Sequence, residues 1–164
     1  MNNQVQNRPH PLLGRFDLDP GRWRPMFYPV EISVPVALGE SGTGSVNLNN
    51  QPYIFTKLTH QIVGDTAHSS TSGLFQDGMY DIEFKDQQSN YQKDPVMADQ
   101  IAGSVIAGYQ TDLPFPIPFA GNRTITFRVT NRVARTLDPE SDYYTVALTM
   151  HGVADWGELV GKRG

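Results

Sequence analysis

The side chains that most often carry out chemistry are sparse in this sequence and lie far apart. The chain has four histidines, at His10, His60, His68 and His151. No two of them have the spacing of a metal site or of a catalytic pair. His60 falls on the more apolar face of an alternating segment, which favours a hydrogen-bonded, partly buried histidine over a ligand or a general base. Cysteine is absent, so disulfides and thiolate chemistry are excluded.

Two acidic groups and one glycine run suggest binding sites, but each lacks a required residue. Asp17-x-Asp19 and Asp138-x-Glu140-x-Asp142 offer calcium-type oxygens without the glycine and distant glutamate of an EF-hand loop. We interpret them as solvated loop residues. The segment 39–44 is rich in glycine but has no lysine for a phosphate. The sequence therefore predicts no catalytic residue, no cofactor and no metal.

Aromatic side chains leave one alternative open. They include Tyr91, Tyr109, Tyr143 and Trp156. Such rings can form a platform for a sugar, although they more often cover the edge of a core or an interface. A carbohydrate-binding module therefore remains an alternative. An enzyme would be indicated by two converging carboxylates, or by an acid beside His60.

Composition limits the architecture and the partners. A chain of 164 residues fits one domain. Only 18% of the residues are charged, and 15 glycines and 12 prolines favour turn-rich β structure over a helical bundle. No apolar run is long enough to span a membrane, and the first residues lack the apolar core of a signal peptide. The net charge of −4 disfavours nucleic acid as a partner.

The first 28 residues differ from the rest of the chain. They carry a net charge of +2, against −6 for the remainder. Prolines and glycines interrupt every helix there, although several large apolar side chains are present. We predict an extended N-terminal arm over residues 1–28 that docks on a neighbouring protein. Its predicted contacts are Arg22, Trp23, Arg24, Phe27 and Tyr28, because aromatic residues and arginine are the usual anchors of interfaces. The alternative is that the arm folds back over its own domain.

Alternation of apolar and polar residues predicts the strands of the body. It covers residues 30–36, 53–63, 79–85, 123–131 and 144–150. Pro35 indicates an edge strand at the first of these. We expect a loop over 39–44, a short strand over 45–48, and a return to strand over 104–109. Asp94 and Pro95 resemble the start of a short helix.

The segment Leu113–Phe119 contains three prolines, which exclude a central strand because each removes a ladder donor. We expect it to lie extended across the end of the sandwich or against a neighbour, with Phe115 and Phe119 as contacts. The overall prediction is an all-β chain with a single jelly-roll-like β-sandwich at residues 29–152 and at most one short helix. A tail at residues 153–164 contributes Trp156 as a further contact.

Three segments carry a resemblance to a known group of proteins. They are Ile101–Gly108, the stretch from Leu113 to Asn131, and Tyr144–Gly152. Together they resemble the C-terminal half of small tailed-bacteriophage virion proteins, with a Phe/Pro-rich crossing, a strand ending in Thr-Asn and a final strand ending in Gly. The similarity covers about a third of the 164 residues.

The resemblance implies a jelly-roll head-decoration (cement) protein, which we expect to bind and stabilise the phage head through its arm and its sheet edges. The implied partners are the major capsid protein and neighbouring copies of the same chain, with a trimer as one arrangement. The implied location is the virion, after assembly in the host cytoplasm. The long arm departs from the most compact members of the group, which leaves a tail, neck or vertex role open. The group has no catalytic motif, so no functional residue is carried over.

Overall fold

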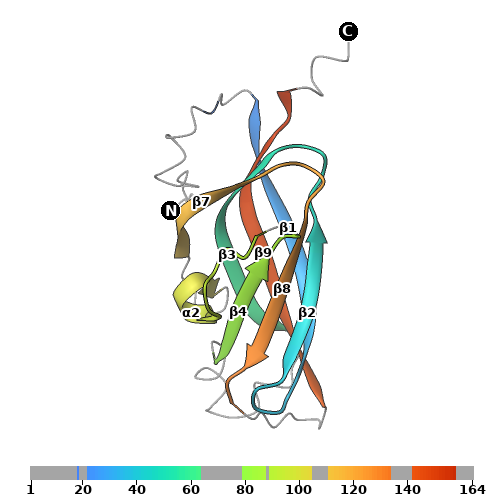
Figure 1. The fold of residues 1–164 in the computed structure, drawn as a ribbon, viewed down its shortest axis with the longest axis vertical. Helices are drawn as coiled ribbons and strands as arrows, with labels where there is room; N and C mark the ends of the chain where they lie inside the picture. The colour runs from blue at the N-terminus through green and yellow to red at the C-terminus, as the bar shows by residue number, and fades with distance from the viewer. Residues whose placement is uncertain are drawn as a thin grey trace, which may run out of the picture.

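The computed structural model describes Leu18 and residues 22–63, 79–87, 89–104, 111–133 and 142–157. These residues form a β-sandwich of two sheets (Figure 1). The larger sheet has the order β1 (Trp23–Pro35), β9 (Tyr143–Asp155), β3 (Tyr53–Val63) and β6 (Gly103–Ser104), and β7 (Thr111–Phe119) also pairs with β3. The smaller sheet has the order β2 (Ser41–Asn47), β8 (Thr124–Asn131), β4 (Tyr80–Lys85) and β5 (Val96–Met97). The all-β prediction and the β-sandwich are confirmed.

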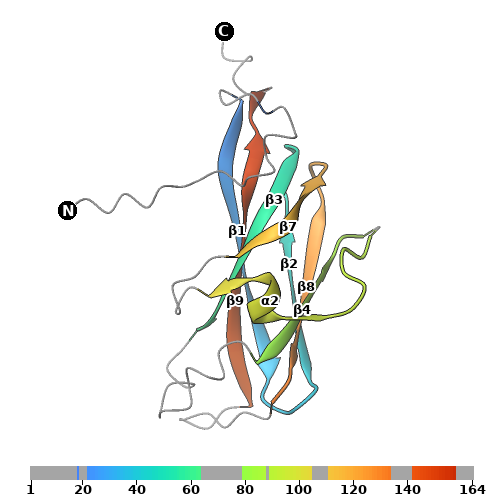
Figure 2. The same ribbon diagram turned by 90° about the vertical axis from the view of Figure 1, so that its left-hand side faces the viewer.

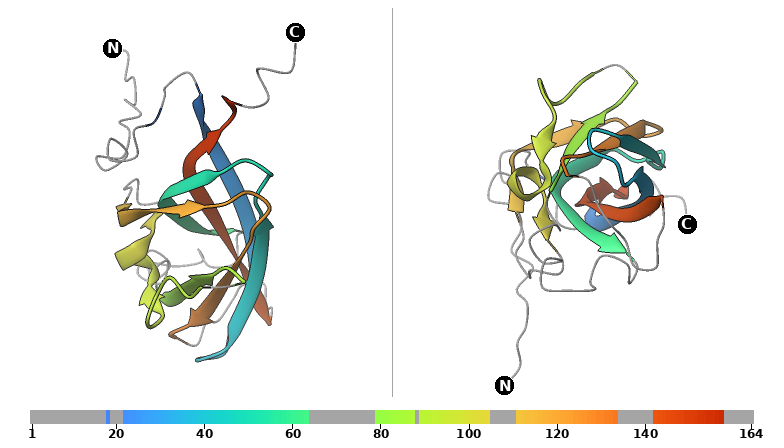
Figure 3. Two further views of the ribbon diagram at one scale, coloured as in Figure 1. Left: turned by 45° about the horizontal axis from the view of Figure 1, so that its top comes forward. Right: turned by 90° about the horizontal axis from the view of Figure 1, so that it is seen from below.

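The core lies between the two sheets, which face each other in the end-on view of Figure 3. Every second side chain of β9 and β8 points inward and is buried. Across the layers, the ring of Phe55 contacts that of Phe84 at 5.5 Å between centroids. Within the smaller sheet, Phe84 contacts Phe127 at 5.9 Å. Burying one large apolar side chain contributes about 1.5–3 kcal/mol. The alternation seen in the sequence is therefore what holds the layers together.

Strand β1 begins earlier than the sequence predicts. It pairs with β9 in an unbroken register from Trp23 opposite Asp155 to Pro35 opposite Tyr143. Residues 23–28, which we assigned to an extended arm, thus belong to the sheet. The remainder of the arm, apart from Leu18 and Arg22, lies outside the described residues.

Prolines do not interrupt β1 because of the side on which they fall. The amide of Val36 donates to the carbonyl of Asp142, and that of Trp156 donates to the carbonyl of Arg22. Even-numbered positions of β1 therefore bond to β9. The odd-numbered prolines of the strand are Pro25, Pro29 and Pro35. Their missing N–H groups would point away from β9, at an edge, where proline is tolerated. The edge position predicted from Pro35 is confirmed.

Strand β2 also begins earlier than predicted, since residues 41–44 form a strand instead of a loop. A Cβ on Gly42 would lie 2.1 Å from the carbonyl oxygen of Ser33 and 2.9 Å from a methyl of Ile32. Glycine therefore lets β2 run close beside β1, where the edges of the two sheets meet (Figure 3). The glycine run is an adaptation of a strand to a close neighbour.

Strand β7 is a bulged edge strand. Phe119, Pro118 and Ile117 pair with residues 53–55 of β3, and Asp112 and Thr111 pair with residues 57 and 58. Four residues of β7, 113–116, thus lie opposite the single β3 residue Thr56. Pro114 and Pro116 fall in this unpaired stretch, where no ladder donor is needed. The prediction that the segment is extended and not central is confirmed, but it pairs with β3 in the larger sheet instead of lying across the end of the sandwich.

The described residues contain one short helix, α2 (Ala98–Ile101), as predicted. It begins after Met97 and not at Pro95, because Val96 and Met97 first pair with β4. Of the predicted strand at 104–109, Ser104 pairs with His60, and residues 105–110 lie outside the described residues. Within the described ranges, no helix has the length and apolar character needed to cross a membrane.

Candidate interaction surfaces

Phe27 is an exposed aromatic side chain on the outer face of the larger sheet. Its side chain is 53% exposed, and its ring meets that of His151, the opposite residue on β9, at 5.2 Å and nearly at right angles. A nitrogen of His151, Nε2, lies 2.9 Å from the hydroxyl of Thr59. Burial, with a smaller effect of Lys57, lowers the pKa of His151 below its ordinary 6.5. His151 is therefore neutral at pH 7, and Phe27 rests on an uncharged surface.

Arg22 bonds within its own chain. Its Nε lies 2.5 Å from Oδ1 of Asp155, an oxygen that also accepts the amide hydrogen of Gly157. The bond to Arg22 holds the pKa of Asp155 below its ordinary 3.8. Trp156 packs against the core, and Trp23 is half-buried. Among the predicted contacts of the arm, Arg24 and Phe27 lie on β1 with exposed side chains.

Two of the predicted contacts face their own domain. The ring of Tyr28 meets that of Tyr53 at 5.1 Å, and its hydroxyl accepts the amide hydrogen of Asn49. Phe119 is only 4% exposed and packs between Phe55 and Tyr91. The prediction of Phe119 as a partner contact is wrong, since the ladder to β3 turns its ring into the core. Tyr28 likewise packs within the sandwich.

Phe115 is the most exposed of the large apolar side chains in the described residues, at 71%. It lies in the unpaired stretch of β7, at the border of an apolar groove of about 390 Å³. The groove is formed by β7, α2, the end of β4 and residues 91–96. Figure 2 shows β7 and α2 on the same flank of the sandwich. Phe115, which we predicted as a partner contact, is thus exposed next to a groove that the sequence did not predict.

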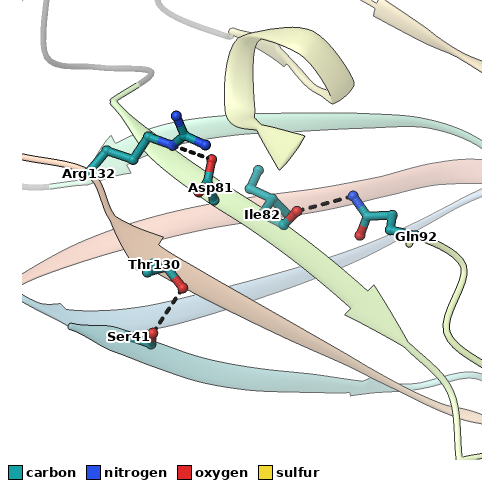
Figure 4. Close-up of polar contacts among 6 residues, drawn as sticks. All are labelled: Ser41, Asp81, Ile82, Gln92, Thr130 and Arg132. Carbon is teal, nitrogen blue, oxygen red and sulfur yellow. Dashed lines mark hydrogen bonds and ion pairs between the residues drawn. The ribbon is translucent and has the colours of Figure 1, made fainter. Parts of the chain in front are cut away.

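Two side chains fix the floor of this groove. The ring of Tyr91 stacks on Phe84 at 5.9 Å, and its hydroxyl donates to Asp86. Burial and the carboxylate of Asp86 raise the pKa of Tyr91 to about 12. The side chain of Gln92 accepts the amide hydrogen of Phe84 at 2.8 Å and donates to the carbonyl of Ile82 at 3.1 Å (Figure 4). Because Gln92 bonds to the β4 backbone like a neighbouring strand, the groove wall is held in place.

The edges of the sheets are poorly suited to pairing with another chain. Prolines remove outward donors from β1, Gln92 and β5 cover the edge of β4, and β7 is bulged. Natural sheets use such devices to prevent edge-to-edge pairing. We predicted binding through the sheet edges, but these edges favour contact through exposed side chains such as Phe115 and Phe27.

His60 has an acid beside it, which is the arrangement that we set as an indicator of an enzyme. Its Nδ1 lies 2.5 Å from the hydroxyl of Tyr80, and its Nε2 lies 3.4 Å from a carboxylate oxygen of Asp99. The imidazole is completely buried, whereas Asp99 is half exposed. The expected hydrogen-bonded histidine is confirmed. A substrate could contact its ring only if the packing around it moved.

The aromatic residues considered for a sugar platform are not brought together. Tyr91 stacks on Phe84, and Tyr109 lies outside the described residues. Tyr143 and Trp156 adjoin opposite ends of the 13-residue strand β9. At 3.3 Å per residue, roughly 40 Å separates them. The two rings cannot contact one sugar.

The described residues contain no cluster of three or more histidine or acidic side chains able to hold a metal ion. Comparison of the chain with protein-family models, with curated proteins and with solved structures found no match.

Proposed function

We propose that this chain is a structural virion protein, a decoration (cement) protein that binds the head shell of a bacteriophage through exposed side chains. The observation that carries the proposal is Phe115, a phenylalanine 71% exposed beside an apolar groove. An exposed aromatic next to a pocket is the usual composition of a contact that dominates an interface. The resemblance noted in the sequence supplies the partner: the major capsid protein, with neighbouring copies of the chain.

The strand order supports the jelly-roll expectation. Strands β1, β9, β3 and β7 form one layer, and β2, β8, β4 and β5 form the other. The chain crosses between layers from β1 to β2, from β2 to β3 and from β3 to β4. Two Greek keys combined in this way build the jelly rolls of viral capsid proteins and also of lectins. The fold therefore suits a capsid subunit without excluding a role at the tail, neck or vertex.

A decoration role matches the blunted edges of the sheets. Contact through a few exposed side chains gives a modest affinity for one site, because an interface of ordinary strength buries about 800 Å² on each partner. A symmetric shell repeats the site many times, and linked copies multiply a weak contact. Copies joined to one another, as in a trimer, would gain the most in overall affinity for the shell.

The test is the composition of phage particles produced from a genome that encodes the chain. Quantitative mass spectrometry is expected to find the chain in a copy number comparable with that of the major capsid protein. A copy number as low as the number of subunits in one ring or one spike would place the chain at the tail, neck or vertex instead. Absence from purified particles would overturn the proposal.

A pair of variants tests the role of Phe115 in the same particles. Phe115→Asp is expected to reduce incorporation at least tenfold, because it places a charge in an apolar contact. Leu38→Asp is the matched control, since Leu38 is 66% exposed in the turn between β1 and β2. Equal incorporation of the two variants would contradict a contact at Phe115.

A further inference from the structure

We infer that the groove beside Phe115 receives residues 8–16 of a second copy of this chain. The inference deepens the proposed function by naming one partner of the groove. It rests on the chemistry of the groove, on the sequence of the segment before β1, and on the exposure of Phe115 among the described residues.

The groove has the lining of a site for an extended, proline-containing segment. Rings of Phe84, Tyr91 and Phe115 border it together with Pro114, and Gln100 supplies an amide. Aromatic-lined grooves of this kind bind polyproline-type helices, which are preformed and lose little entropy on binding. A volume of about 390 Å³ accommodates a few side chains. The groove therefore fits a short extended peptide with apolar side chains.

Residues 8–16 have that composition: Arg-Pro-His-Pro-Leu-Leu-Gly-Arg-Phe. Pro9 and Pro11 restrict the backbone to extended conformations. Leu12, Leu13 and Phe16 are large apolar side chains that gain free energy when buried. The segment thus combines the backbone and the side chains that the groove would recognise.

The charges are complementary as well. Residues 8–16 contain two arginines and no acid. The charged residues that directly adjoin the lining residues in sequence are the acids Glu83, Asp99 and Asp112 and the cations Lys85 and Lys93, a net charge of −1. Opposite charges around an apolar contact steer the approach and fix the orientation of the partner.

A second copy, and not the same one, is the source of the segment. Phe115 is 71% exposed, so the described residues of its own copy do not cover it. Strand β1 starts at one pole of the molecule in Figure 1. Ten residues separate Leu12 from Arg22, and an extended chain of that length spans at most about 35 Å. The segment can therefore reach beyond its own pole to a neighbour packed against it.

The test uses the full chain and its lack of cysteine. Asn7→Cys introduces a single thiol just before the segment, and a nitroxide spin label is attached to it. This labelled chain, without isotope enrichment, is mixed with ¹⁵N-enriched chain that carries no label. We expect the side-chain amide signals of Gln92 and Gln100 to lose at least half of their intensity. The signals of Gln51, in the turn before β3, are expected to keep theirs.

Variants of the enriched chain identify the groove. Phe115→Asp is expected to restore the Gln100 signal while the dispersion of the other amide signals shows an intact fold. Arg8→Glu in the labelled chain is expected to reduce the broadening, and so is raising the salt concentration, which screens charge pairs.

Three results would overturn the inference. One is the absence of broadening in the mixture. Another is broadening only when label and isotope are on the same chain, which would mean that the segment binds its own copy. The third is broadening unchanged by Phe115→Asp. None of these results depends on the particle-composition test. If the chain is found in particles but the labelled segment causes no broadening in a second copy, only the inference about the groove is refuted. If broadening between copies is observed but the chain is absent from particles, only the decoration role is refuted.

Discussion

Asn131 ties together three parts of the chain with a single side-chain amide. It is 1% exposed, and its Nδ2 lies 2.9, 3.3 and 3.4 Å from the carbonyl oxygens of Val36, Ala37 and Pro35. Its Oδ1 accepts a hydrogen bond from the hydroxyl of Tyr144. Buried polar groups are costly when they lose such partners. The turn after β1 is therefore fixed to β8 and β9 by this residue.

Asn131→Ala is expected to lower the free energy of unfolding by about 2 kcal/mol, because it removes the shared donor of the turn and the acceptor of Tyr144. Urea unfolding followed by circular dichroism measures the change. Asn47→Ala is the matched control: Asn47 is exposed and accepts one bond, from Thr124. Equal losses in the two variants would show that the buried network contributes nothing beyond the substitution itself.

Asp155 makes stability depend on pH at the acidic end. Its bond to Arg22 holds the folded-state pKa below the ordinary 3.8, so folding favours the charged form. This contribution is present above pH 3.8 and is lost as the pH falls through the lower folded-state pKa. Between pH 6 and pH 3, the urea midpoint is expected to fall further in the wild type than in Asp155→Asn.

A second variant controls for the removal of one negative charge. Asp142→Asn, an exposed position just before β9, is expected to follow the wild-type profile. A profile of Asp155→Asn parallel to that of the wild type would contradict the role of the Arg22 pair.

Strand β4 is completed by the side chain of Gln92 instead of a full neighbouring strand. Gln92→Met keeps the approximate volume but leaves the amide of Phe84 and the carbonyl of Ile82 without these partners. We expect a loss of about 1–3 kcal/mol in the free energy of unfolding, measured by urea denaturation. Gln100→Met changes the lining of the same groove without touching β4 and is expected to be near neutral. A similar loss in both variants would refute the bridging role.

Strand β1 is protected at its free edge by Pro25 and Pro29. Replacing both with Val restores two outward N–H donors and is expected to cause edge-to-edge association. Sedimentation velocity should show a several-fold larger dimer fraction at equal concentration. Pro52→Val, which removes a proline before β3, is the control and should sediment like the wild type. A double variant that stays as monomeric as this control would mean that the prolines do not protect the edge.

The sequence predicted those elements whose alternation is free of glycine and proline. Strand β3 matches its predicted bounds of residues 53–63 because its β-branched, aromatic and other apolar residues are not interrupted by a glycine or a proline. The start of β1 was missed because Pro25 and Pro29 look like interruptions of a strand. Both are odd-numbered positions, so both lie with their nitrogen atoms toward the free edge of β1. The start of β2 was missed because Gly42 and Gly44 are typical of loops. These glycines are explained by the position of β1, which leaves no room for a Cβ at either residue.

The candidate surface was predicted in part. Phe115 and Phe119 are four residues apart, and on a regular strand they would share a face. The unpaired stretch of β7 separates them, leaving Phe115 exposed and Phe119 in the core. The groove itself depends on Tyr91 stacking on Phe84 and on α2 lying beside β7. Contacts between elements distant in sequence are not encoded in a local pattern, so the groove could not be predicted.

At the scale of the molecule, the two sheets are joined where β2 runs beside β1. Gly42→Ala places a methyl group 2.1 Å from the carbonyl oxygen of Ser33 and forces these strands apart. We expect a loss of about 1–3 kcal/mol in the free energy of unfolding, the usual cost of overpacking. Chemical denaturation followed by tyrosine and tryptophan fluorescence measures it. The neighbouring exposed residue supplies the control, Thr43→Ala, with an expected change of about 0.5 kcal/mol. Equal changes would show that the close approach is not required.

The start of β1 and the end of β9 lie side by side, joined by Arg22 and Asp155. Tension applied between these two points acts across the ladder and not along it. The hydrogen bonds between β1 and β9 would then break one after another, so the force required to separate the strands stays low. The same strands loaded lengthwise would resist with many bonds at once. In the proposed decoration role, the molecule would hold best when its neighbours contact the groove flank and leave this pole unloaded.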